Sequence, residues 1–295
     1  MYVGLDCGGS TCRSLAINSA GEPVFHGQSG AANLATTPDP LLRRHLARAT
    51  EACPDAVAVC GCFAGLLTVA DRRRAEALLR EVFPGAAVRA EPDYAAAFAA
   101  ADSPIDVCVI AGTGALACSA KDGAWVKTGG GGYLIGDQGS AFDLGRRALQ
   151  HYLFSDQPPS PLTLSLIEQT FETTANDEIV ARLYDHQSPP AMLAKLAPAL
   201  SKDAEAGYSY AVEALDAAMG ALACLTVQHI HRHVPGAGTV RIGLAGGVWK
   251  TSATVLRVFI SSIRGQLDRS FDVERLRRPP VYGATALAKE LTLGN

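Results

Sequence analysis

The chain has 295 residues, a net charge of −3 and a charged fraction of 19%. This length predicts about two domains. The weak negative charge gives no sign of the clustered basic surface that nucleic-acid binding requires. Every uncharged run, Ala56 to Ala70 among them, is shorter than the ~20 residues of a membrane span, and no signal-like segment opens the sequence. We therefore expect a soluble, cytoplasmic protein without nucleic-acid or membrane partners.

The same local pattern occurs twice along the chain. The first copy runs from Tyr2 to Ile17 around Cys7-Gly-Gly-Ser-Thr11, and the second runs from Asp106 to Ala120 around Gly112-Thr-Gly114. Each copy predicts a strand, a glycine-rich loop and a second strand, followed by a glycine turn and a third strand. Glycines between two strands let free backbone N–H groups converge on one point. The repeat therefore indicates two loops that hold a polyphosphate.

Strand and helix patterns alternate along the remaining sequence. Strands are predicted at 56–60, 86–90 and 239–244; helices are predicted at 39–52, 69–83, 94–101, 140–153, 252–267 and 283–291, with mostly helical sequence over 162–233. The basic run Arg72 to Arg74 is interpreted as a solvated face of the second of these helices.

Asp6 lies at the carboxyl end of the first strand, where a carboxylate can hold a hydrated Mg²⁺ ion. The loop after it leads into another strand rather than a helix. This order disfavours the Rossmann and Walker loops, which open a helix and place the phosphate at its N-terminus. A purely structural hairpin turn remains the alternative.

Three further positions have two interpretations each. Asp93 precedes a helix, so it is either an N-cap or a general base that accepts a proton from a substrate hydroxyl. Asp137 lies in a glycine-rich loop before a helix and has the same ambiguity. The segment Ala245 to Gly247 is either a tight turn or a surface that lets a flat ligand such as adenosine approach the backbone.

The cysteines and histidines give weaker signals. No C-x-x-C pattern occurs among the eight cysteines, so we interpret them as reduced and mostly buried rather than as metal ligands. Among His229, His231 and His233, only the first and last share a helix face. They lie in the last helical turn, where cations complement the helix dipole.

Taken in order, these motifs resemble the acetate kinase–sugar kinase–heat-shock-protein–actin superfamily. Within it, the chain is similar to the N-acetylglucosamine kinase and BadF/BadG/BcrA/BcrD ATPase group, most specifically at Gly132 to Ser140 and Gly145 to Leu149. The resemblance implies an α/β fold of two ribonuclease-H-like domains with ATP in the cleft between them. The expected domains are residues 1–105, joined by a C-terminal helix at 282–295, and residues 106–281.

The resemblance also implies roles for individual positions. Asp93 would be the catalytic base, and Asp6 would lie near Mg²⁺. The residues expected to bind ATP are Asp6, Gly8, Gly9, Ser10, Thr11, Gly112, Thr113, Gly114, Gly246 and Gly247. The residues expected to bind the sugar are Asn33, Gly65, Asp93, Gly131 and Asp137. The implied reaction transfers the γ-phosphate of ATP to an amino-sugar hydroxyl, most simply the 6-hydroxyl of N-acetylglucosamine or a close relative, in a homodimeric enzyme.

The chain also departs from the N-acetylglucosamine kinases. It has Ala115 and Leu116 where they commonly have polar residues, and Gly131 where they often have tryptophan. Loss of these groups weakens the case for N-acetyl recognition, so a glucosamine kinase is the nearest alternative. Two others are an ATPase that activates a radical dehydratase through an iron–sulfur cluster, and a non-catalytic sugar or nucleotide sensor.

Overall fold

The computed structural model describes residues 1–53 and 55–292, which form two compact units. Unit 1 comprises Met1–Pro104 and the C-terminal segment from Leu276, and unit 2 comprises Ile105–Arg275. The predicted end of the first domain, residue 105, is one residue after the observed end of the first segment of unit 1. The predicted end of the second domain, residue 281, is six residues after the observed end of unit 2. The chain already belongs to unit 1 before the last helix begins, since Arg278 pairs with Asp102 there.

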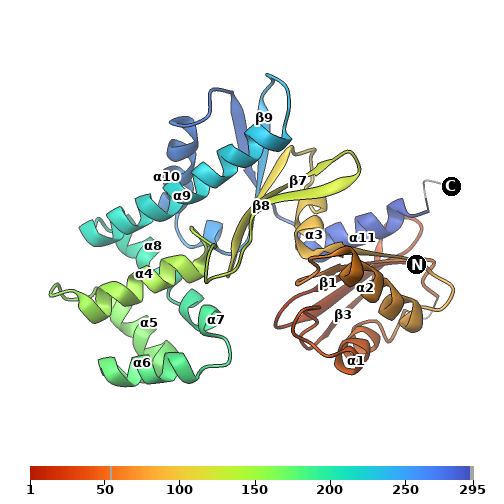
Figure 1. Cartoon of the computed structure of the whole chain (residues 1–295), viewed down its shortest axis with the longest axis horizontal. Coiled ribbons are helices and arrows are strands. Elements are labelled where there is room, and N and C mark those ends of the chain that lie inside the picture. Colours follow the sequence, from red (N-terminus) through yellow and green to blue (C-terminus); the bar gives the residue numbers. More distant parts are fainter. Residues whose placement is uncertain (54, 293–295) are drawn as a thin grey trace. The chain divides into compact units, whose positions relative to one another are not determined.

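Unit 1 contains a five-stranded mixed sheet in the order β3-β2-β1-β4-β5, drawn in red to orange in Figure 1. Its strands are β1 (Tyr2–Cys7), β2 (Cys12–Ile17), β3 (Pro23–Ser29), β4 (Ala58–Phe63) and β5 (Ala87–Pro92), and its helices are α1 (Asp39–Ala49), α2 (Val69–Val82), α3 (Asp93–Ala99) and α11 (Pro280–Glu290). The strands β1, β2 and β3 form an antiparallel meander, whereas β4 and β5 run parallel to β1.

Side chains along β1 point alternately to the two faces of this sheet, and each face is covered by helices. Val3 and Leu5 point into an apolar cluster that includes Leu42 and Leu46 of α1 and Leu79 of α2. The opposite face packs closely on α11, which α3 also contacts.

Unit 2 repeats this sheet, in the order β10-β9-β6-β7-β8. Its elements are β6 (Val107–Ala111), β7 (Ala115–Lys121), β8 (Ala124–Gly129), α4 (Ala141–Phe154), α5 (Pro161–Phe171), α6 (Asn176–Asp185), α7 (Pro189–Ala194), α8 (Ala197–Glu205), α9 (Ser209–His233), β9 (Val240–Ala245), the 3₁₀ turn η1 (Val248–Lys250), α10 (Ala253–Arg264) and β10 (Phe271–Arg275). Here β6, β7 and β8 form the meander, and β9 and β10 run parallel to β6. The two predicted hairpins are thus confirmed as equivalent parts of two similar sheets.

Helix α9 is the longest helix of unit 2 in the described part of the chain, shown in cyan in Figure 1. By length and composition alone it could cross a membrane. Its buried residues, among them Leu215, Met219 and Leu222, instead belong to the unit 2 core, where the helix packs on α8, α10 and β7.

The edge strand β10 is a correction to the sequence prediction, which placed no strand after residue 267. It pairs in parallel with β9, from Phe271 opposite Val240 to Arg275 opposite Leu244. Its five residues carry three charges, so its local signal is weak, and the pairing with β9 decides its structure.

Candidate functional site

Three parallel strands of unit 1 end at the same edge of the sheet. The register places Cys7 of β1 opposite Phe63 of β4, and Phe63 opposite Pro92 of β5. Asp6 is one residue before this line, and Asp93 is one residue after it. The structure therefore brings the two predicted acidic residues to one edge, separated by the end of β4.

The first predicted phosphate loop joins β1 and β2 at this edge. It is a four-residue hairpin loop in which the backbone N–H of Gly8 donates to the carbonyl of Thr11 at 2.9 Å. The carbonyl of Gly8 accepts from the N–H of Ala32 at 3.0 Å, which ties the loop to the segment after β3. Gly9 and Ser10 are exposed at its tip. This geometry leaves the tip of the loop open to a ligand.

Burial raises the pKa of the Asp6 carboxyl above its ordinary value, and the nearby guanidinium of Arg13 partly opposes this shift. These two residues are opposite each other in the β1–β2 register. Among the described residues, no group of three or more His, Cys, Asp or Glu side chains could form a metal cage. A single carboxylate does fit Mg²⁺ that arrives with ATP, because such an ion keeps waters and phosphate oxygens as most of its ligands.

Asn33 and Gly65 meet where the loops after β3 and β4 converge. The N–H of Leu34 donates to the carbonyl of Ala64 at 2.8 Å, and Asn33 Oδ1 accepts from the N–H of Ala35 at 2.8 Å. Gly65 has a φ of +78°, and a Cβ at this position would collide with Asn33 Oδ1. Glycine is thus required here by its backbone conformation and by its close contact with Asn33, a residue predicted to bind the sugar.

Asp93 is the first residue of α3, and Pro92 occupies the N-cap position. The capping interpretation of Asp93 is therefore wrong. Its side chain is exposed, and its Oδ1 accepts from the backbone N–H of Tyr94 at 2.9 Å. A carboxylate at this position can reach a bound molecule.

The arginine run in α2 is not the solvated face that its sequence suggests. Arg72 donates to the carbonyl of Ala90 at 2.5 Å and to the buried carboxylate of Glu91 at 2.8 Å, two residues before Asp93. Arg74 donates to the carbonyl of Leu34 at 2.9 Å and to Asp39. Two of the three arginines therefore fix the segments that carry Asp93 and Asn33.

In unit 2 the second glycine loop joins β6 and β7. The N–H of Gly112 donates to the carbonyl of Gly114 at 2.9 Å. Ile110 is opposite Ala245 in the β6–β9 register, so the loop after β9 begins beside it. Gly246 has a φ of +107°, and a Cβ there would collide with the carbonyl of Ala111. The predicted phosphate and adenosine loops of this unit are thus in direct contact.

Asp137 lies against the same loop. Its Oδ1 accepts from the N–H of Ala115 at 3.1 Å, and its side chain is buried. Burial raises the pKa of this carboxyl, while the hydrogen bond from Ala115 and the charge of Lys127 oppose that rise. Ser140, and not Asp137, caps α4, since its Oγ accepts from the N–H of Asp143.

Gly131 is exposed in the loop between β8 and α4. This loop starts where the N–H of Gly130 donates to the carbonyl of Ala115 at 3.0 Å, and it carries exposed Leu134 and Ile135. Gly131, Asp137 and the second phosphate loop are thus grouped around Ala115.

Sequence reasoning missed the roles of Arg13, Arg72, Arg74 and Glu91. The available signal for Arg13 was a charged residue two positions after the glycine loop, because the hairpin register puts it opposite Asp6. The ion pairs of Arg72 and Arg74 join residues far apart in sequence, so no local sequence pattern predicts them.

A comparison with protein-family models matches residues 3–285 to the BadF/BadG/BcrA/BcrD ATPase family. The chain belongs to this family. The match spans both units and every candidate residue described above.

This ATPase family member is similar to several known proteins. It is 27% identical over 257 residues to the glucosamine kinase of Vibrio cholerae, covering 84% of each chain. Two solved structures share its fold: a candidate N-acetylglucosamine kinase of Porphyromonas gingivalis (TM-score 0.77, 19% identity) and another of Chromobacterium violaceum (TM-score 0.73, 22% identity). Each alignment covers 97% of this chain and 98% of the other. These likenesses confirm the predicted α/β fold of two similar domains.

Proposed function

We propose that the protein is an ATP-dependent amino-sugar kinase. It transfers the γ-phosphate of ATP to the 6-hydroxyl of N-acetylglucosamine or a close relative, with glucosamine as the main alternative. The observation that carries this proposal is the alignment in unit 1 of a glycine phosphate loop, Asp6 and Asp93 at the ends of three neighbouring strands. The ATPase family and the glucosamine kinase relative support it.

Each unit contributes defined groups to the proposed reaction. Gly8 to Thr11 and Gly112 to Gly114 bind phosphate oxygens through backbone N–H groups, and Gly246 to Gly247 bind the adenosine. Asn33, Gly65, Gly131 and Asp137 contact the sugar. Asp6 holds Mg²⁺, which neutralises charge on the phosphates when it is bound.

Asp93 acts as the base. Its carboxylate takes the proton of the sugar hydroxyl as that oxygen attacks the γ-phosphorus, the bond from phosphorus to the bridging oxygen breaks, and ADP leaves. Backbone N–H groups of the loops stabilise the charge on the transferred phosphoryl group. A base in this role needs access to substrate, and the exposure of Asp93 fits that need.

Two amino sugars are considered as the substrate, N-acetylglucosamine and glucosamine. Ala115 and Leu116 stand close to Asp137 and Gly130, so the surroundings of Asp137 are less polar than the N-acetylglucosamine kinase pattern. Together with the glucosamine kinase relative, this supports glucosamine, which lacks the acetyl group, as the main alternative to N-acetylglucosamine. The homodimer and the cytoplasmic location stay predictions.

The cysteines support a kinase over an iron–sulfur ATPase. All eight lie in the described part of the chain; seven are buried, and Cys224 is exposed. An exposed cluster at a subunit interface would need several accessible thiolates.

ADP release by the purified protein tests the proposal. We expect Mg²⁺-ATP turnover to be stimulated strongly by glucosamine or N-acetylglucosamine and weakly by glucose and N-acetylmuramic acid, with phosphate found on the sugar by mass spectrometry. Equal, slow ADP release with and without sugar would favour the ATPase alternative. ATP or sugar binding without ADP release would favour the sensor.

A further inference from the structure

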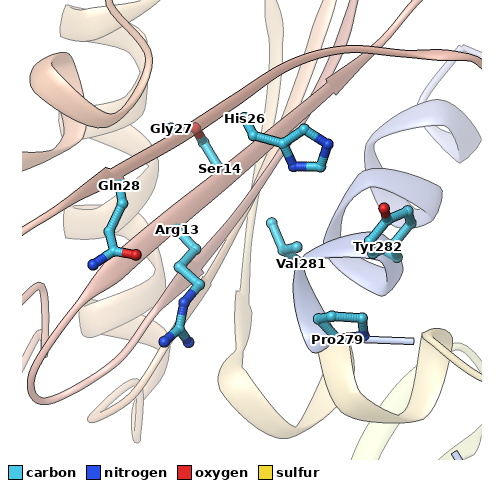
Figure 2. A pocket seen from close by; sticks show the side chains of 8 residues that line it. All are labelled: Arg13, Ser14, His26, Gly27, Gln28, Pro279, Val281 and Tyr282. Carbon is cyan, nitrogen blue, oxygen red and sulfur yellow. The ribbon is translucent and has the colours of Figure 1, made fainter. Parts of the chain in front are cut away.

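Unit 1 contains a pocket of about 600 Å³ that the proposed reaction does not use. It lies between β2, β3 and the first turn of α11, and Figure 2 shows its side chains. None of the residues assigned above to phosphate, Mg²⁺ or sugar lines it. Its volume falls within the range of small-molecule sites.

Hydrogen-bond donors from three elements line this pocket. Arg13 of β2 and Gln28 of β3 are opposite each other in register and so share a face of the sheet. His26 of β3 and Tyr282 of α11 approach across the pocket, with ring centroids 6.4 Å apart. Within residues 1–53 and 55–292, no hydrogen bond or ion pair engages the side chains of these four residues.

The charge at the pocket is positive. Arg13 supplies a permanent cation, and Asp6, opposite it in the β1–β2 register, is not within ion-pair distance. The N-terminus of α11, an 11-residue helix, adds the positive end of its dipole near Val281, whereas Pro279 and Pro280 have no N–H to donate. The chain therefore presents a guanidinium, an amide, an imidazole and a phenol to one space without an acid that pairs with them.

From this arrangement we propose that the pocket binds a small phosphate monoester. The doubly charged, acceptor-rich phosphate matches Arg13, Gln28 and the start of α11. The ring of Tyr282 and the apolar surface of Pro279 and Val281 pack against the organic part of the ester. The inference goes beyond the proposed kinase reaction and does not depend on it.

Isothermal titration calorimetry of the full chain, without nucleotide or Mg²⁺, tests the inference. The probes are glucose 6-phosphate, inorganic phosphate and glucose. We expect glucose 6-phosphate to bind most tightly, inorganic phosphate more weakly, and glucose not to bind, because the phosphate supplies the charge and the ring adds packing.

Four variants locate the binding. Arg13→Gln removes the cation, and Gln28→Glu places a negative charge on an exposed edge strand, where it is not expected to affect folding. Each is expected to weaken glucose 6-phosphate binding about tenfold or more, because Arg13→Gln removes a charge-assisted contact and Gln28→Glu replaces an amide donor with a carboxylate that repels phosphate. Arg48→Gln makes the same charge change on an exposed part of α1 and serves as the matched control. Gly9→Asp adds a charge at the first phosphate loop, where no atom crowds a side chain.

Binding that is lost in Arg13→Gln and Gln28→Glu and retained in Arg48→Gln and Gly9→Asp supports the pocket. Three results overturn it: no binding of glucose 6-phosphate by the unaltered chain, equal losses in Arg48→Gln, or loss in Gly9→Asp with full binding in Gln28→Glu. The last result would assign the phosphate to the loop. Sugar-stimulated ADP release is measured separately, so failure of this inference leaves the kinase proposal standing.

Discussion

Asp137 accepts a hydrogen bond from the backbone N–H of Ala115, with 3.1 Å between oxygen and nitrogen. The residue has a φ of +64° and is buried beside the second phosphate loop. Burial raises its pKa, so the ionised form is less favourable here than in water. A neutral amide could accept the same hydrogen bond, so this bond does not require the negative charge.

We expect Asp137→Asn to be as stable as the unaltered protein, or more stable, at neutral pH. Because the folded-state pKa is raised, ionised Asp137 lowers stability as pH rises through that pKa, and asparagine does not titrate. Asp137→Ala should be destabilised by about 2–4 kcal/mol, since it leaves the N–H of Ala115 unpaired and puts alanine at a positive φ. Urea unfolding at pH 7 measures both. An asparagine variant less stable than the alanine variant would contradict this account.

Asp93→Asn should lower kcat by about 10²–10⁴-fold, because the amide cannot accept the proton of the attacking hydroxyl. ATP affinity should stay nearly unchanged. Folding stability should change little, since Asp93 is exposed and Pro92 holds the cap position. Steady-state kinetics with the sugar that stimulates ADP release, together with calorimetric ATP binding, provides the measurement. If the variant keeps most of its turnover, Asp93 is not the base.

Gly65→Ala should raise the KM for the sugar while leaving the KM for ATP nearly constant. The added Cβ would collide with Asn33 Oδ1 and lie 2.7 Å from the N–H nitrogen of Ala35, so it displaces the Asn33 loop. Gly85→Ala is the matched control, because Gly85 also has a positive φ, +96°, but has open space around it. Both variants carry similar backbone strain. A sugar KM that rises equally in both would remove Asn33 from the sugar site.

The two hairpins could be predicted from the sequence because their signals are local. Strand alternation and a glycine loop lie within about 15 residues of one another in each copy, and the register follows from the short loop. The repeated order of elements then identifies two similar sheets. Gly246 could be predicted for the same reason, since a tight turn after β9 needs a glycine at its φ of +107°.

Features that depend on distant residues could not be predicted in this way. Arg72 and Arg74 look like an exposed helix face until β5 and the loop after β3 supply Glu91 and Leu34 as partners. Asp93 looks like an N-cap, because Asp is common there, but the preceding Pro92 takes that position. For the two arginines the tertiary partner determines the role, whereas for Asp93 the adjacent Pro92 does.

His229 provides a test on pH. It is buried in α9 between the hydroxyls of Ser119 and Thr128, both 3.0 Å from its ring nitrogens, and its ring centroid is 4.8 Å from that of His233. The shared helix face is thus confirmed. However, burial, with a smaller effect of His233, lowers the pKa of His229 to about 4, so it is neutral near pH 7 and does not act as a cation at the helix end.

Folding stability should therefore fall as pH decreases from 6.5 towards 4. In this range His229 binds a proton in the unfolded chain but stays neutral in the folded protein. His229→Gln retains hydrogen-bonding groups for the two hydroxyls but cannot titrate, so its stability should depend less on pH in this window. His231→Gln, at an exposed position on the same helix, is the control and should keep the full slope. Urea midpoints at intervals from pH 4 to pH 7 give the three slopes. Equal slopes in the unaltered protein and His229→Gln would show that another group controls acid unfolding.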